Sequence, residues 1–229
     1  MHPVDIVLID LDGTISDSSP GMLTGFRKVF DRFDMEQPSD ESIRRHFGPP
    51  LAVTWREVYG MTDEQIVVGL EVYREYYHDV GMFENNLYDG VPDLIKDLHA
   101  EGVTLSTATS KPEFSASRII EHFGLREYFT FIGAADLAGT RDDKSAVIAH
   151  ALTHLNANSN SHSIVMVGDR RHDVEGARDH GIDTIGVLWG YGDADELTEA
   201  GAFTVVRDTN ALRHAILHYP VKGTSIDFE

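Results

Sequence analysis

Six short apolar runs recur along the chain, and helical patterns separate them instead of tight turns. This order is typical of parallel strands joined by crossover helices. The runs are apolar at nearly every position, so both faces of the predicted sheet are expected to be covered. The predicted strands are Val4–Ile9, Val103–Ala108, Phe129–Gly133, Ile164–Val167, Thr184–Leu188 and Phe203–Val206.

Amphipathic segments lie between these runs and predict helices. Alternation of strands and helices indicates an α/β fold, here a doubly wound, Rossmann-like parallel sheet. The predicted helices are Pro92–Ala100, Pro112–Phe123, Asp143–Leu155, Asp173–His180, Asp195–Ala200 and Asn210–His218.

Residues 19–85 contain only helical signals and interrupt this alternation after the first strand. Ser19 is expected to cap one helix, and the sequence from Thr62 to Gln65 is a capping box that opens another. The segment is too long for an ordinary crossover connection. We therefore expect an α/β core domain made of residues 1–18 and 86–229, with an all-helical cap domain inserted at 19–85.

Composition narrows the classes of chemistry and partner. The 229 residues include no cysteine, which excludes thiol catalysis, zinc–thiolate sites and disulfides. The 38 Asp and Glu outnumber 19 Lys and Arg, and the formal charge of −19 disfavours nucleic-acid polymers and anionic membranes as partners. A small anionic substrate can still bind where a site is locally positive. The N-terminal segment lacks the pattern of a signal peptide, so a cytoplasmic protein is expected.

Two carboxylates follow the first predicted strand, where ligands bind in an open parallel sheet. Asp10 and Asp12 would face the same way if the strand geometry persists, and Mg²⁺ would relieve their repulsion. Gly13 permits a tight turn that exposes N–H groups to a phosphate. A plain loop is the alternative. A calcium loop does not fit, because Thr14 and Gly21 stand where acidic ligands are required.

Polar residues also end the second and fourth strands and begin the helix between the third and fourth. Thr109 and Ser110 could cradle a phosphate or merely cap a helix. Lys144, in a first helical turn, suggests a neighbouring anion, with an exposed lysine as the alternative. Asp169 would complete the metal site. Asp173 would orient Lys144 or a metal-bound water without being a metal ligand itself. The alternative is that Asp173 only stabilises the N-terminus of its own helix as an acidic residue.

In this order, the four segments resemble the motifs of the haloacid dehalogenase superfamily of phosphohydrolases, and the insert resembles its small α-helical cap. The segments are Asp10-Leu11-Asp12-Gly13-Thr14, Thr109, Lys144 and Gly168-Asp169-x-x-x-Asp173. The resemblance implies that Asp10 is a nucleophile that forms an aspartyl-phosphate and that Asp12 is the general acid and base. It also implies Mg²⁺ held by Asp10, Asp169 and the Asp12 backbone carbonyl, with Thr109 and Lys144 on the phosphoryl oxygens.

Within the superfamily, the chain resembles phosphoglycolate phosphatases and 5′-nucleotidases. The likeness rests on Phe47-Gly48-Pro49-Pro50-Leu51, the run from Tyr73 to Tyr77, the run from Leu87 to Val91 and the fourth motif. It implies a small phosphorylated metabolite as substrate, with Phe47, Gly48, Pro49 and Pro50 setting specificity, in a monomer or homodimer. A β-phosphoglucomutase-like phosphotransferase and a receiver-like phosphoacceptor are the alternatives.

Overall fold

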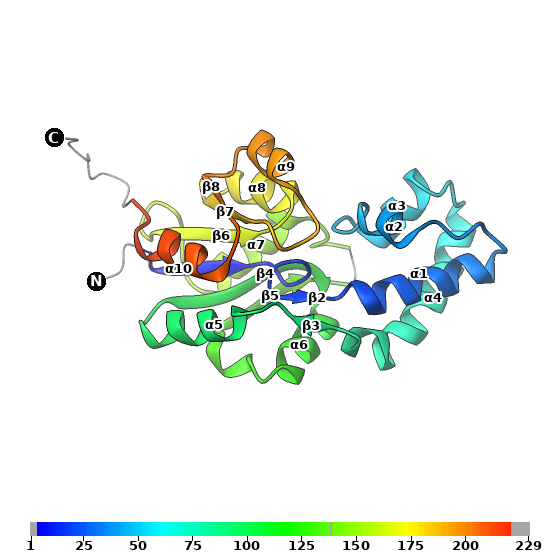
Figure 1. Cartoon of the computed structure of the whole chain (residues 1–229), viewed down its shortest axis with the longest axis horizontal. Coiled ribbons are helices and arrows are strands. Elements are labelled where there is room, and N and C mark those ends of the chain that lie inside the picture. Colours follow the sequence, from blue (N-terminus) through cyan, green and yellow to red (C-terminus); the bar gives the residue numbers. More distant parts are fainter. Residues whose placement is uncertain (1–3, 138, 221–229) are drawn as a thin grey trace.

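A six-stranded parallel sheet forms the centre of the molecule in a computed structural model that describes residues 4–137 and 139–220 (Figure 1). The strand order is β5-β4-β1-β6-β7-β8, and every adjacent pair is parallel. The predicted α/β class is therefore confirmed. Residues 1–3, 138 and 221–229 of the predicted core domain lie outside the described residues. The strands are β1 (Ile6–Ile9), β4 (Thr104–Pro112), β5 (Phe131–Ala135), β6 (Ile164–Gly168), β7 (Asp183–Val187) and β8 (Thr204–Val206).

Helices cover both faces of this sheet, as the continuous apolar strands require. Along β1, Val7 and Ile9 point to the face covered by α5 (Val91–Ala100), α6 (Glu113–His122) and α10 (Thr209–Leu217). Ile6 and Leu8 point to the opposite face, which is covered by α7 (Lys144–His154) and α8 (Arg171–Arg178). The helix α9 (Ala194–Ala200) packs against α8. This alternation of side chains buries two apolar clusters, one on each face of the sheet.

The observed helices and strands begin and end close to the predicted positions, and the differences have local causes. The α7 helix begins at Lys144 because the Asp143 side chain caps it by accepting a hydrogen bond from Ala146 N, at 2.7 Å. The β5 strand begins at Phe131, after a 3-10 helix η2 (Arg126–Tyr128). The largest difference is in β4, which continues past the predicted end at Ala108 into a polar segment.

Four helices and a 3-10 helix lie between two short antiparallel strands, β2 (Ser16–Asp17) and β3 (Asn86–Leu87). Figure 1 shows them gathered at one end of the molecule, beyond the sheet. They are α1 (Ser19–Arg32), α2 (Asp40–Arg44), α3 (Leu51–Glu57), α4 (Asp63–Asp79) and η1 (Gly81–Phe83). Their shared core is aromatic, with the Phe26 ring 5.8 Å from Trp55 and 6.2 Å from Tyr73.

The helices α1 to α4, called the cap helices below after their predicted role, test two local predictions. The capping box at Thr62 and Gln65 is confirmed, with both reciprocal hydrogen bonds present. The prediction that Ser19 caps α1 is wrong, because the helix already includes Ser19, and the Asp17 side chain accepts the Ser19 N–H at 3.0 Å. Across residues 4–137 and 139–220, none of the helices has both the length and the apolar character that a membrane span requires.

Candidate active site

The site lies at the carboxyl ends of β1 and β6, which are neighbours in the sheet. From β1 the chain builds outward to β4 and β5 on one side, and then to β6, β7 and β8 on the other. The loops that follow β1 and β6 therefore diverge at a topological switch point, where open α/β sheets bind ligands. Asp10 directly follows β1, and Asp169 directly follows β6.

Three buried carboxylates meet at this point. Asp10, Asp169 and Asp173 each offer an oxygen, and these oxygens lie within 4.8 Å of one another. Asp173 reaches the cluster from the first turn of α8. The Lys144 ammonium lies 2.9 Å from Asp10 Oδ1 and 2.7 Å from Asp173 Oδ1, and it donates a hydrogen bond to the Ala108 carbonyl. The anion that the position of Lys144 suggested is therefore the protein's own pair of carboxylates.

The charges of this cluster do not balance. Burial raises the pKa of Asp10 from 3.8 to about 6, although Lys144 opposes the shift. Burial, followed by the charges of Asp173 and Asp10, raises the pKa of Asp169 to about 8. Burial alone would lower the pKa of Lys144, but Asp10 and Asp173 hold it above its ordinary value. Three carboxylates and one ammonium leave an uncompensated negative charge, and this set of hard oxygen ligands fits a divalent cation such as Mg²⁺.

The turn after Asp10 is shaped around Asp169. Gly13 has a φ of +85°, and a Cβ at this position would overlap the Asp169 carboxylate. The Thr14 hydroxyl donates to Asp169 Oδ1 at 3.2 Å. The Gly13 N–H, predicted to bind phosphate, donates to the Ser16 carbonyl at 2.9 Å, so a phosphate would compete for this donor. The role that the structure gives to Gly13 is to make room for Asp169.

Most of the predicted site residues line one cavity of about 260 Å³ between the sheet and the cap helices. The core contributes Asp10, Asp12, Thr109, Ser110, Lys144 and Asp173, and the cap contributes Phe47, Gly48, Pro49 and Pro50. Two predicted residues, Gly13 and Asp169, are not part of the lining. Asp169 is fully buried beside it. The cavity thus brings together residues from both parts of the chain that the sequence assigned to catalysis and to specificity.

Sequence reasoning missed Lys111 as a site residue. Its side chain is only 5% exposed, and its ammonium lies 2.7 Å from Asp12 Oδ2. The carboxylate of Asp12, predicted beside the metal, is thus bound by a lysine, and the role of its backbone carbonyl stays a prediction. The signal in the sequence is the polar segment before Pro112, in which Thr109 and Ser110 alone predict a phosphate cradle or a helix cap.

The loop after β7 is a second feature of the site. The aromatic residues that follow this predicted strand favour core packing in the sequence alone, with a place beside the site as the alternative. Tyr191 N donates to Asp169 Oδ2 at 2.7 Å, and Trp189 Nε1 donates to the Thr14 carbonyl at 3.0 Å. Between them, a Cβ on Gly190 would overlap both the Asp169 carboxylate and the Gly13 carbonyl. This loop therefore closes over Asp169 and fixes one of its oxygens. The glycines that alternate with aromatic residues after the strand were the available signal.

The loop of Phe47, Gly48, Pro49 and Pro50, called the cap loop below, rests on this same part of the core. The Phe47 ring lies 5.3 Å from the Tyr191 ring, edge to face. The Phe47 carbonyl accepts a hydrogen bond from Arg170 Nη1, and Arg170 Nε is 2.8 Å from Glu196 Oε1. The loop predicted to recognise the substrate thus contacts Tyr191, whose N–H binds Asp169, and Arg170, which follows Asp169 in the sequence.

Comparisons with known proteins agree with this geometry. Residues 7–187 match the family described as haloacid dehalogenase-like hydrolase. Tyrosine-protein kinase PtkA of Mycobacterium tuberculosis is 40% identical over 214 residues, which cover 92% of this chain and 72% of that protein. A 5′-nucleotidase of Pseudomonas aeruginosa is 33% identical over 210 residues, which cover 92% of this chain and 94% of that protein. The crystal structure of a predicted phosphatase from Clostridium acetobutylicum has a TM-score of 0.89 at 37% identity, covering 93% of this chain and 98% of that one.

The family match spans most of the chain, including the strands that carry Asp10 and Asp169. That crystal structure shares both the sheet and the helical part, since the similarity covers nearly all of each chain. The chain therefore belongs to the haloacid dehalogenase-like hydrolase family and groups with its phosphatases.

Proposed function

We propose that this protein is a magnesium-dependent phosphatase that hydrolyses a small phosphomonoester through a phosphoryl group carried on Asp10. The observation that carries the proposal is the buried cluster of Asp10, Asp169 and Asp173 with Lys144, placed beside a cavity that also contains Asp12. Such an excess of negative charge is costly to bury without a cation, so a solely structural role does not account for the cluster.

The proposed reaction has two steps. An Asp10 oxygen attacks phosphorus while the bond to the leaving oxygen breaks, and Asp12 gives that oxygen a proton. Asp12 then takes a proton from water, the water oxygen attacks phosphorus, and the Asp10 carboxylate is released. Thr109, Ser110 and Lys144 line the cavity beside Asp10 and would hold the phosphoryl oxygens.

Mg²⁺ fits the cluster because its ligands are hard oxygens and its charge offsets their excess. Asp10 and Asp169 would hold it together with the Asp12 backbone carbonyl, and when bound it would neutralise the charge of the phosphoryl group. Asp173 supports this arrangement by fixing Lys144, at 2.7 Å. Asp169 is itself fixed by Thr14 and Tyr191 N, so its oxygens are already oriented.

Within this proposal, residues 19–85 act as a cap domain that selects the substrate, and residues 1–18 and 86–229 form the core domain. On the side formed by residues 19–85, the cavity is bounded mostly by apolar and aromatic side chains, together with Arg74 and His78; the apolar and aromatic ones are Met22, Phe47, Leu51, Leu70, Tyr73 and Tyr77. Such a surface suits a leaving group with an apolar ring better than the short, charged glycolate. Of the two predicted substrate types, this favours nucleoside 5′-monophosphates over phosphoglycolate, and a 5′-nucleotidase is among the relatives.

We therefore expect kcat/KM for a nucleoside 5′-monophosphate to exceed that for phosphoglycolate by at least about 10-fold, because the apolar lining gains contacts only with the larger leaving group. Release of inorganic phosphate measures both rates.

Removal of the metal is a separate test of the proposal. Excess chelator should stop turnover, and added Mg²⁺ should restore it. Faster hydrolysis of phosphoglycolate, or full turnover in chelator, would contradict the proposal.

A second candidate is phosphoryl transfer from Asp10 to a hydroxyl acceptor instead of water. It is favoured by the 40% identity to a protein named as a tyrosine kinase. The acceptor oxygen would replace water in the second step, with Asp12 taking its proton. Incubation with a nucleoside triphosphate and a tyrosine-containing peptide separates the two functions, because transfer yields phosphopeptide and hydrolysis yields only inorganic phosphate.

The cap loop provides a prediction on specificity. Replacing Pro49 and Pro50 together by glycine should lower kcat/KM for good substrates and narrow the differences among them, because the preset loop shape would be lost. A minimal acyl phosphate, with little leaving group to contact, should be affected less. The matched control is Pro38→Gly, in the connection between α1 and α2 and outside the cavity lining. Unchanged rates and ranking in the double variant would show that specificity is set elsewhere in the cap.

A further inference from the structure

Lys111 is buried although the proposed reaction gives it no role. A lysine that is removed from water needs compensating contacts. Two are present: the Asp12 carboxylate, with Oδ2 at 2.7 Å, and the face of the Tyr77 ring, whose centroid lies 4.9 Å from Nζ. The first contact belongs to the core, and the second belongs to the cap helix α4.

The backbone of β4 is irregular at this residue. Thr109 pairs with Ala134 of β5, and the next pair joins Pro112 to Ala135. Ser110 and Lys111 are therefore two extra residues on β4, a bulge in the ladder. The Lys111 N–H donates a hydrogen bond to Thr109 Oγ1 at 3.2 Å, and this hydrogen bond stabilises the bulge. Bulges beside active sites commonly redirect a side chain, and here the redirected side chain reaches the loop after β1, the strand adjacent to β4.

Asp12 needs such support more than Asp10 does. It lies in the loop beyond β1, and its side chain remains 22% exposed. Lys111 binds Oδ2, whereas Oδ1 is buried and has no hydrogen-bond partner among the described residues. One oxygen is thus fixed by a charged donor, and the other is left without a protein partner, as a group that exchanges a proton with substrate or water requires.

The cap completes the surroundings of Lys111. Tyr77 is buried on α4 and stacks on Tyr73, with ring centroids 5.1 Å apart and planes 18° from parallel. This stack gives the ammonium an aromatic face instead of water. Lys111 therefore joins three parts of the molecule: the β4 bulge, the Asp12 loop and the cap helix.

We propose that Lys111 is a positioning residue that holds the Asp12 carboxylate in place for proton transfer. The inference rests on the proposed function. Without the ammonium, the Asp12 side chain has alternative rotamers toward solvent, and proton transfer in both steps becomes less efficient. Lys111 acts through Asp12, so binding of the phosphoryl group by Thr109, Ser110 and Lys144 is unaffected.

The test compares wild type with Lys111→Met on two substrate classes. With a nucleoside 5′-monophosphate, kcat should fall roughly 10- to 100-fold, while KM changes little. This loss is smaller than the loss expected when a general acid is removed altogether, because Asp12 itself is still present. With an aryl phosphate whose phenol leaves without a proton, formation of phosphoryl-Asp10 should remain fast while its hydrolysis slows. Acid-quenched Lys111→Met should therefore carry more protein-bound phosphoryl than wild type, as intact mass shows. Lys111→Arg keeps the charge and should recover part of kcat.

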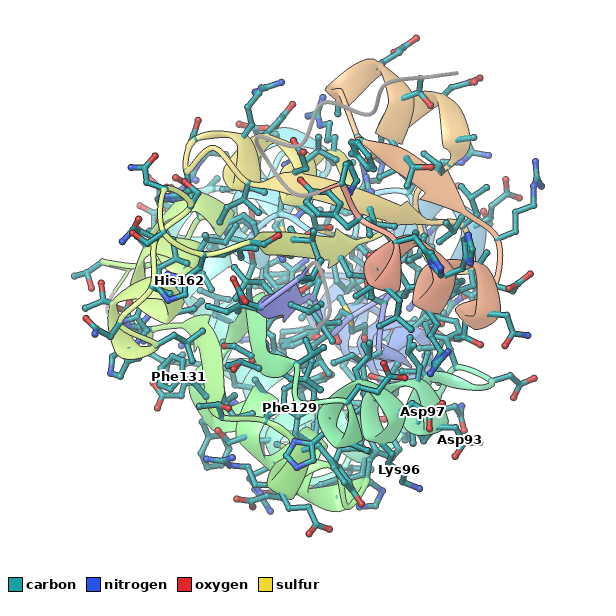
Figure 2. The ribbon with its side chains drawn as sticks, turned by 90° about the vertical axis from the view of Figure 1, so that its left-hand side faces the viewer. Asp93, Lys96, Asp97, Phe129, Phe131 and His162 are labelled. Atoms are coloured by element: carbon teal, nitrogen blue, oxygen red, sulfur yellow. The ribbon has the colours of Figure 1, made fainter. Side chains whose placement is uncertain are left out.

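The matched control is Lys96→Met, since Lys96 lies beside Asp93 and Asp97 on the outer side of α5, at the end of the molecule opposite the cap helices (Figure 2). It should match wild type in rate and unfolding temperature. If Lys111→Met matches wild type, or raises KM with kcat unchanged, the positioning role is wrong. If wild type itself neither releases phosphate nor binds a phosphoryl group, the proposed function fails, and this inference fails with it.

Discussion

Replacing Asp10 by asparagine is expected to abolish turnover, with kcat falling by roughly four orders of magnitude or more, as loss of a nucleophile does in other enzymes. The amide has nearly the shape of the carboxylate but cannot form the acyl phosphate. The fold should persist. Burial raises the pKa of Asp10 to about 6, which means that the charged carboxylate is costly to bury in the metal-free protein, and a neutral amide avoids that cost.

The measurement is phosphate release at saturating substrate, with unfolding temperature recorded for each variant. Asp89→Asn is the matched control, because Asp89 is exposed and lies outside the cavity lining. It should retain the wild-type rate. Substantial activity in a folded Asp10→Asn variant would rule out Asp10 as the nucleophile.

Replacing Asp169 by asparagine is expected to remove the response to Mg²⁺, both in activity and in stability. At a concentration about 100 times its dissociation constant, Mg²⁺ should stabilise wild type by about 2.7 kcal/mol, and this gain should be absent in the variant. Asparagine can still accept from Tyr191 N and donate to Thr14 Oγ1, so the neighbours of Asp169 keep their hydrogen bonds.

Without metal, the same variant should be more stable than wild type at pH 8. Burial raises the pKa of Asp169 to about 8, from 3.8 in the unfolded chain. Between these values the native state binds more protons than the unfolded state, so the stability of wild type falls as the pH rises. Asp169→Asn should flatten this decline. Unfolding temperatures at pH 6 and pH 8, with chelator and with Mg²⁺, test both statements, and a magnesium shift that survives in the variant would contradict them.

The sequence predicted the sheet because its strands are buried on both faces and therefore read as continuous apolar runs. Asp10, Lys144, Asp169 and Asp173 could be placed together because parallel strands align their carboxyl ends at one edge of the sheet. No contact had to be known for that inference. The bounds of the short helices α2 and α3 could not be predicted, because five and seven residues are too few to show a helical period.

The contacts of Lys111 and Tyr191 could not be predicted, for a different reason. The position of Lys111 depends on a register shift between β4 and β5, which a single strand's sequence does not encode. Tyr191 acts through its backbone N–H on Asp169, so its side-chain chemistry gave no indication of the contact. Both depend on how separate loops meet. The role of the Phe47–Pro50 loop in specificity stays a prediction, although the loop lines the cavity.

The most direct test of the account is to locate the phosphoryl group during turnover. Wild-type protein is mixed with substrate and Mg²⁺, quenched rapidly in acid and digested, and the peptides are analysed by mass spectrometry. We expect one phosphoryl group on the peptide that contains Asp10, and none in Asp10→Asn or without substrate. Turnover with no protein-bound phosphoryl group, or with the group on another residue that is still labelled in Asp10→Asn, would contradict it.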